Sequence, residues 1–259
     1  MHTMKRQVLF LIALFVSLSS PVHAEPAKER TDTFKNEQEQ AYTLEAAEFD
    51  GQQKFDEAIA SYTKAIQINP ETSPAYRGRA LSYAKKGDFR AAIADYNKVI
   101  EISPTEIEAY NGRALAFTYL KEYSYALEGF QSVLELAPER ADTYNDIGLV
   151  YQLQGESEQA LRNYSRAIEL DPATQLNAYI SRAVIYNETN KIDEAIADLT
   201  KAATINPKDY RIFYNRAISY FYKQDYDKSW DDLNTVDALG ASVPPQLRQE
   251  LIKASGRDR

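Results

Sequence analysis

Residues 75–104, AYRGRALSYAKKGDFRAAIADYNKVIEISP, decide the fold of this chain. The stretch holds two apolar-periodic segments around a Lys86-Gly87-Asp88 turn, and it ends in an apolar-polar-Pro triplet. Apolar and small side chains recur at spacings of three and four residues, which predicts two amphipathic helices joined by a tight turn. One such hairpin cannot bury its apolar side alone, so it needs neighbours to pack against.

The same pattern recurs along most of the chain. The apolar-polar-Pro triplets end at prolines separated by 34, 34, 34 and 35 residues. Aligning on them gives six blocks with aromatic residues at positions 4 and 11, small residues at positions 8 and 20, and a large residue at position 24. The repeat predicts six stacked hairpins. The blocks begin at Glu39, Ser73, Ile107, Ala141, Leu176 and Tyr210.

These columns resemble the tetratricopeptide repeat, and the resemblance covers about residues 39 to 239. It implies an all-α fold, a right-handed α-solenoid of about six helical hairpins with a C-terminal capping helix. It also implies that positions 2, 5, 9 and 12 of each first helix line a concave groove. A repeat fold of this kind says little about function by itself. The expected repeats are 39–72, 73–106, 107–140, 141–175, 176–209 and 210–241.

Both ends of the chain differ from the repeats. Residues 1–24 have Lys5 and Arg6 before an apolar run and Ala24 at a cleavage position, which predicts a secretory signal, with an uncleaved membrane anchor as the alternative. Residues 25–38 are polar and lack apolar periodicity, so we expect a disordered lead-in. Residues 242–259 start at Pro244-Pro245 and are expected to form the capping helix and tail.

Composition narrows the chemistry. Without residues 1–24 the chain has no His, Cys or Met, which removes thiol nucleophiles, imidazole bases and the usual zinc ligands. We therefore expect no cofactor and no metal. Removing Lys5 and Arg6 leaves 28 basic against 38 acidic residues, a net charge near −10. This balance argues against a nucleic-acid partner, since phosphate binding needs clustered Lys and Arg.

Arginine recurs at position 7, and a basic ligand site is one interpretation. Three of these arginines share their block with an Asp at position 23, which favours Arg–Asp pairs between the two helices of a hairpin. Arg113 is the exception, because Gly129 occupies position 23 of its block. The three predicted pairs are Arg79 with Asp95, Arg182 with Asp198, and Arg216 with Asp232.

The groove positions supply the candidate binding residues. Position 9 is apolar in every block, and exposed apolar patches usually mark contacts. We expect blocks five and six to form an apolar docking cradle, with two asparagines binding the backbone of a partner segment. The alternative is that the cap, the lead-in or a second copy of the chain covers this stripe. The candidate residues are Asn111, Asn145, Leu115, Leu149, Ile180, Val184, Tyr214, Ile218 and Phe221.

The leading functional hypothesis is a non-enzymatic scaffold or adaptor that binds protein or peptide segments in the groove. The predicted signal suggests a periplasmic location and a role in envelope assembly or secretion; an inner-membrane anchor is the alternative. A self-associating structural homo-oligomer is a second hypothesis. A carboxylate-based enzyme is a remote third, because an acid/base pair needs neither His nor Cys. The sequence names neither the partner nor the pathway.

Overall fold

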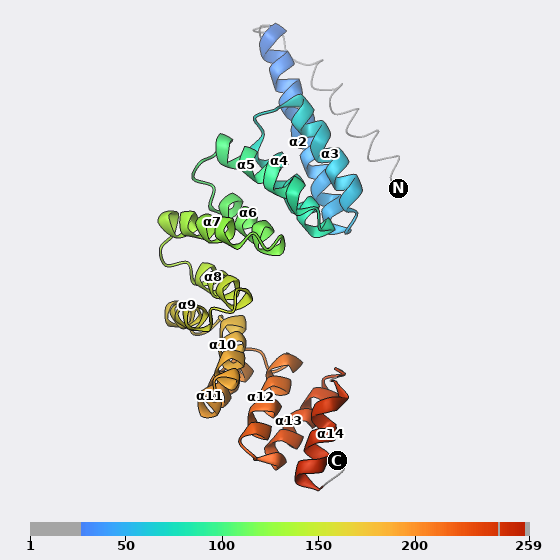
Figure 1. The fold of residues 1–259 in the computed structure, drawn as a ribbon. Coiled ribbons are helices and arrows are strands. Elements are labelled where there is room, and N and C mark those ends of the chain that lie inside the picture. The colour runs from blue at the N-terminus through green and yellow to red at the C-terminus, as the bar shows by residue number, and fades with distance from the viewer. Residues whose placement is uncertain (1–26, 243, 257–259) are drawn as a thin grey trace. The chain divides into compact units, whose positions relative to one another are not determined.

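The computed structural model describes residues 27–242 and 244–256, and these residues form thirteen α-helices and no strand (Figure 1). The predicted all-α array of helical hairpins is confirmed. The helices are α2 (Ala27–Gly51), α3 (Phe55–Ile68), α4 (Ser73–Lys86), α5 (Phe89–Ile102), α6 (Ile107–Tyr119), α7 (Tyr123–Leu136), α8 (Ala141–Leu153), α9 (Ser157–Leu170), α10 (Leu176–Glu188), α11 (Ile192–Ile205), α12 (Tyr210–Tyr222), α13 (Tyr226–Ala238) and α14 (Pro245–Ser255).

Five first helices begin at the residues where the 34-residue blocks begin. These helices are α4, α6, α8, α10 and α12, starting at Ser73, Ile107, Ala141, Leu176 and Tyr210. The apolar-polar-Pro triplets stop five of the six second helices, because proline disfavours helical backbone in the residue before it. Helix α13 lacks the triplet and ends at Ala238, before Leu239 and Gly240. The predicted signal, residues 1–24, lies outside the described residues. Among the described residues, no helix combines the length and apolarity needed to cross a membrane.

The expected disordered lead-in differs from the structure. Helix α2 extends back to Ala27, so residues 27–38 are helical and not irregular. Residues 33–38 are exposed, which agrees with their lack of apolar periodicity. The prediction was wrong here because adding residues to an existing helix costs little, and Lys, Glu, Gln and Ala all favour helix.

The chain separates into two compact units, Met1–Ala75 and Tyr76–Arg259. In the first unit, α2 and α3 pack through Ala46, Ala58 and Tyr62. The hydroxyl of Thr72 donates to the Glu39 carboxylate at 2.7 Å, which ties the segment after α3 back to α2. This unit therefore has a small alanine-rich core, with small residues at positions 8 and 20 where the two helices meet.

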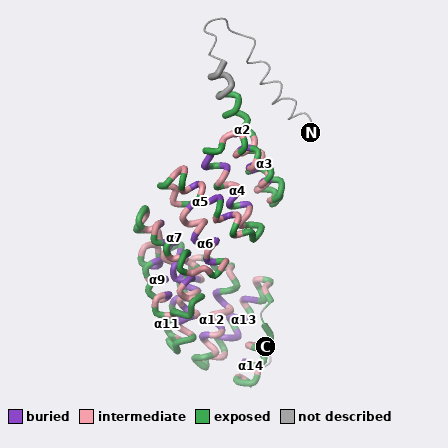
Figure 2. Tube along the Cα trace, turned by 45° about the horizontal axis from the view of Figure 1, so that its top comes forward, coloured by how far each residue is buried: buried purple, intermediate pink, exposed green. Residues whose placement is uncertain are grey.

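The second unit repeats this packing through five hairpins and the cap. Buried residues recur along each helix, as Figure 2 shows in purple. Small side chains at positions 8 and 20 let the helix backbones approach, and the aromatic columns fill the space beside them. Gly148 illustrates the closeness, since a Cβ there would lie 2.7 Å from the buried Tyr164 ring.

Every hairpin turn uses the same backbone geometry. Position 15 has positive φ in all six blocks, and the N–H of position 16 donates to the carbonyl of position 11. This is the Schellman ending of a helix, which satisfies carbonyls that have no partner within the helix. Glycine fills position 15 in only two blocks; the six residues are Gln53, Gly87, Lys121, Gly155, Asn190 and Gln224.

Helix α14 closes the second unit as the predicted cap. Pro245 starts the helix, and Gly256 ends it at φ 66° with its N–H donating to the Ile252 carbonyl at 2.9 Å. Leu251 is fully buried in a cluster with Trp230 and Leu233 of α13. The cap thus covers the last hairpin, as a stacked array requires at its open end.

Candidate protein-binding face

The position-7 arginines are structural, as predicted. Arg182 donates from Nε and Nη2 to the two carboxylate oxygens of Asp198, both at 2.8 Å. Its Nη1 also donates to Ser165 of the preceding hairpin at 2.8 Å. Arg182 therefore joins its own second helix to the one before it, and Arg216 reaches Thr200 of the preceding hairpin in the same way at 3.4 Å. The same bidentate pairing joins Arg79 to Asp95 and Arg216 to Asp232.

Arg113 is the exception that the sequence identified. Its Nη1 donates to Asn97 of the preceding hairpin at 2.8 Å, and its guanidinium lies 5.5 Å from the Tyr110 ring centroid. Its Nε is buried without a hydrogen-bond partner among the described residues. Burial lowers the pKa of this guanidinium, because no Asp faces it. A Cβ on Gly129 would lie 2.8 Å from the Ala114 Cβ, so the close helix contact excludes a side chain there.

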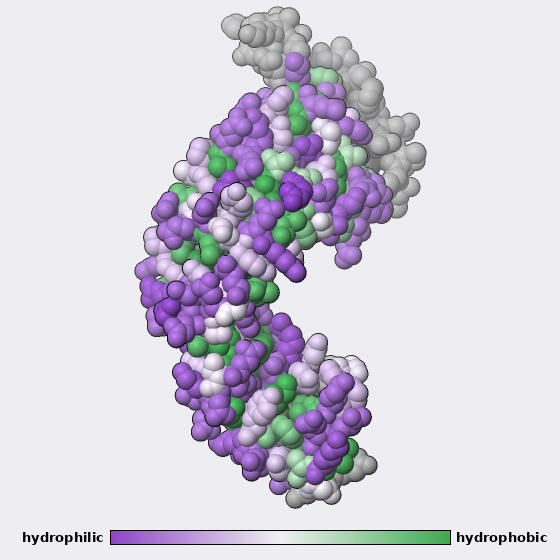
Figure 3. Space-filling view, in the orientation of Figure 1, coloured by the Kyte–Doolittle hydropathy of each residue, from purple (hydrophilic) through white to green (hydrophobic). Residues whose placement is uncertain are grey.

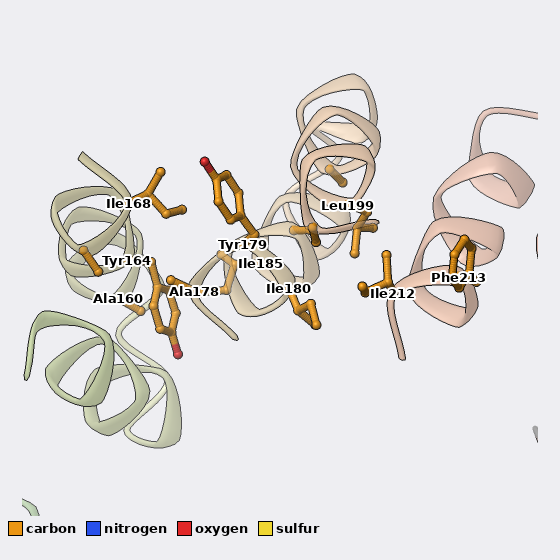
Figure 4. Packing of buried hydrophobic residues seen from close by; sticks show 14 of the residues in the cluster. Ala160, Tyr164, Ile168, Ala178, Tyr179, Ile180, Ile185, Leu199, Ile212 and Phe213 are labelled. Carbon is orange, nitrogen blue, oxygen red and sulfur yellow. The ribbon is translucent and has the colours of Figure 1, made fainter. Parts of the chain in front are cut away.

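Positions 5 and 12 of the first helices lie in the seams between hairpins. Ile180, at position 5, is only 7% exposed and shares a core cluster with Ile212 of α12. Figure 4 shows Ile180, Leu199 and Ile212 together in the region between α10, α11 and α12. At position 12, the Asn187 Nδ2 donates to the Ser219 hydroxyl of the next hairpin at 2.9 Å. The expectation that Ile180 lines the groove was therefore wrong.

The predicted docking cradle in blocks five and six is also corrected. Tyr214 and Phe221, at positions 5 and 12 of α12, pack against the cluster that contains Leu251 of the cap. The Phe221 ring lies 6.0 Å from the Tyr226 ring across the hairpin turn. The cap helix packs on α13, and its Leu251 belongs to the cluster against which Tyr214 and Phe221 pack. This was the alternative left open for the stripe.

The open surface of the first helices holds positions 2, 6, 9 and 13, whereas the sequence predicted positions 2, 5, 9 and 12. At 3.6 residues per turn, positions 2, 6, 9 and 13 fall within about 60° of one another on the helix, and positions 5 and 12 lie about 80° to one side of their middle. Leu149 and Leu153 of α8, at positions 9 and 13, are 38% and 52% exposed. Leu81 of α4 is 46% exposed. Sequence reasoning missed Leu153, although the 100° rotation per residue would have found it.

We call the apolar residues at positions 9 and 13 of the first helices in the second unit the first-helix stripe. Its members range from half-buried to well exposed, and Tyr119 stacks on Phe89 with ring centroids 4.7 Å apart. Figure 3 shows apolar side chains interspersed with polar ones over the surface in view. The stripe comprises Leu81, Leu115, Tyr119, Leu149, Leu153, Val184, Ile218 and Tyr222.

The predicted asparagines flank the stripe. Asn111 and Asn145 are half-buried at position 5 of α6 and α8. Asn145 Nδ2 lies 3.4 Å from the Asp146 carboxylate, a long contact that holds the amide weakly. Asn111 makes no side-chain hydrogen bond to any other described residue. Neither amide is held by a strong side-chain hydrogen bond among the described residues.

Carboxylates accompany the leucines on this side of the array. Arg140 binds Glu108 with both Nη atoms, at 2.8 and 3.3 Å. Asp142 accepts a hydrogen bond from the Gln175 amide at 2.9 Å. Burial raises the pKa of Asp146 to about 6, and the charge of Asp142 adds to the rise. No group of three or more potential metal ligands occurs among the described residues.

Comparisons with known proteins agree with the repeat. Two models named tetratricopeptide repeat match residues 141–173 and 176–209, and a TPR repeat model matches residues 51–87 and 80–120. Among proteins of curated function, no sequence match to this chain was found.

Three solved structures illustrate the likeness. A crystal structure of MamA is 27% identical with a TM-score of 0.57, and the match covers 63% of this chain and 95% of MamA. The structure of pilF from Pseudomonas aeruginosa is 17% identical with a TM-score of 0.69, covering 85% of this chain and 98% of that one. YrrB, described as a TPR protein with an unusual peptide-binding site, is 22% identical with a TM-score of 0.53, covering 75% and 96%. These likenesses agree in an all-α repeat fold.

Proposed function

This chain belongs to the tetratricopeptide repeat family, and we propose that it is a non-enzymatic scaffold whose first-helix stripe binds a segment of a partner protein. Arrays of this type use their extended repeated surface for protein binding. The observation that supports the stripe most strongly is the exposure of Leu149 and Leu153, one turn apart on a helix whose other sides are packed.

The proposed contact has an apolar and a polar part. The leucines supply apolar area, at about 25 cal/mol for each Å² removed from water. Asn111 and Asn145 supply donors and acceptors for peptide groups of a bound segment that turn away from water. The proposal centres on blocks two to four, not on blocks five and six as expected from the sequence.

A peptide selection tests this function. A library of random 12-residue displayed peptides is selected on the chain from Glu25 onward, and the affinities of the recovered peptides are measured on variants. Leu149→Ser with Leu153→Ser is expected to weaken binding at least tenfold, about 1.4 kcal/mol. The matched control is Leu136→Ser, because Leu136 is a similarly exposed leucine on a second helix. Recovered peptides that bind the Leu149→Ser, Leu153→Ser double variant as tightly as the Leu136→Ser control would contradict the proposed function.

We also propose that the protein works in the cell envelope. Support comes from residues 1–24, with a basic start, a short apolar run and a small-residue cleavage position. Amino-terminal sequencing of the protein from fractionated cells tests this. The expected result is a chain that starts at Glu25 in the envelope fraction; a chain that keeps its first residues in the cytoplasmic fraction would contradict it.

A further inference from the structure

Helix α8 places two carboxylates and two exposed leucines on one side. Asp142, Asp146, Leu149 and Leu153 occupy positions 2, 6, 9 and 13, which fall within about 60° of one another on the helix; Asp142 and the two leucines are exposed, and Asp146 is half-buried. At 1.5 Å per residue, Asp146 lies about 4.5 Å along the axis from Leu149 and about 10.5 Å from Leu153. Charge and apolar surface are therefore within reach of one short partner segment.

The two carboxylates have no cation of their own among the described residues. Asp142 accepts from the Gln175 amide at 2.9 Å, and Asp146 has only the 3.4 Å contact with the Asn145 amide. The nearby cation is Arg140, whose two Nη atoms are both bound to Glu108; its charge also acts on Asp142 and Asp146, but it forms no direct ion pair with either of them. A neutral amide holds Asp142, Asp146 has one weak amide contact, and Arg140 offsets their charge only in part.

The surroundings of Asp146 would strengthen an ion pair with a cation from a partner. Its side chain is half-buried, and burial raises its pKa to about 6. Nearby, the Tyr164 hydroxyl donates to Gln152 at 2.7 Å, and the charge of Asp146 acts on that hydroxyl as well. An ion pair in such partly desolvated surroundings is stronger than one in open water.

The first helices on either side of α8 also carry negative charge at these positions. At positions 2, 5, 6, 9, 12 and 13 of α6, α8 and α10, the described residues include four carboxylates and no Lys or Arg. The arginines at position 7 of α6 and α10, Arg113 and Arg182, point to the second helices instead. Glu108 is paired with Arg140, so the other three carboxylates leave this surface with an excess of negative charge. The four carboxylates are Glu108, Asp142, Asp146 and Glu188.

We propose that α8 selects a partner segment in which a Lys or Arg side chain lies two or three residues from an aliphatic side chain. The cation pairs with Asp146 and Asp142, and the aliphatic group covers Leu149 and Leu153. This inference rests on the proposed function and names the chemistry of the partner. The spacing follows from an extended segment, which advances about 3.3 Å per residue against the 4.5 to 10.5 Å between the groups on α8.

The test uses the peptides recovered from the 12-residue library. Lys or Arg near an aliphatic residue is expected to be enriched over its frequency in the unselected library. For one such peptide, replacing its cation by Gln should weaken binding to the unaltered chain about tenfold. On Asp146→Asn the Lys and Gln forms should bind within about twofold of each other, because the carboxylate that distinguishes them has been removed.

The matched control is Asp231→Asn, which removes the same charge from an exposed site on the second helix α13. The tenfold preference for the Lys peptide should persist there. Recovered peptides without cation enrichment, or a preference that survives Asp146→Asn, would overturn this inference. If the stripe binds a segment of other chemistry, the same peptides would still bind more weakly to the Leu149→Ser, Leu153→Ser double variant. Failure of this inference is therefore distinguishable from failure of the proposed function.

Discussion

Arg182 and Asp198 form a bidentate pair between α10 and α11, with both N–O distances at 2.8 Å. Asp198 is buried and Arg182 is half-buried, so neither group is well solvated. Removing one partner of such a pair leaves an uncompensated charge, which costs far more than the pair contributes as a whole.

We therefore expect Asp198→Asn to destabilise the chain by about 3 kcal/mol. The measurement is urea unfolding followed by circular dichroism at pH 7. Glu194→Gln is the matched control, because Glu194 is exposed on the same helix and should change stability by less than about 0.5 kcal/mol. Equal effects of the two substitutions would show that the pair does not stabilise the seam.

Arg113 should behave differently from Arg182 under the same substitution. Its Nε has no partner among the described residues, and Gly129 offers no carboxylate. Arg113→Met keeps the aliphatic packing and removes a poorly compensated charge, so we expect a change within about 1 kcal/mol of the unaltered chain. Arg182→Met should lower the unfolding free energy by about 3 kcal/mol. A loss of that size for Arg113→Met would contradict this account of the third hairpin.

Asp146 gives the stability a pH dependence with a definite sign. Its pKa is raised from 3.8 to about 6, so folding disfavours the charged form. The contribution of Asp146 is therefore most favourable below about pH 4 and becomes a cost as the pH rises through 6. Asp146→Asn should raise the unfolding free energy at pH 7.5, by on the order of 1–2 kcal/mol, and change it little at pH 4. Thermal melts at the two pH values check this; a destabilised variant at pH 7.5 would contradict the expected sign.

The hairpin turns allow a paired backbone test. Lys121 has φ 59° at a position where Gly87 and Gly155 occur in other hairpins. A side chain in the left-handed region is strained and glycine is not, so Lys121→Gly should stabilise the chain by about 0.5–1 kcal/mol. Gly87→Ala, with φ 84°, should destabilise it by about 1 kcal/mol. Urea unfolding of both variants measures the difference, and opposite signs are required.

The sequence by itself determined the hairpins and their ends. Prolines at intervals of 34 and 35 residues mark where the second helices end. Small residues at positions 8 and 20 repeat at the helix period. Both signals can be read from the sequence because turn chemistry and helix period are local. The Arg–Asp pairs were also predictable, because positions 7 and 23 recur together in three blocks. The sequence missed the first turns of helix α2, because a solvated helical segment carries no apolar pattern and because extending an existing helix costs little.

Only the tertiary structure decided which side of each first helix stays open. Ile180 and Leu149 look alike in sequence, yet Ile180 is buried against Ile212 of the next hairpin and Leu149 is exposed. The cap likewise contributes Leu251 to the cluster against which Tyr214 and Phe221 of α12 pack. Helix periodicity separates the positions of Ile180 and Leu149 by angle, but which angle faces the neighbouring hairpin depends on how one hairpin is rotated against the next, and that relationship is non-local.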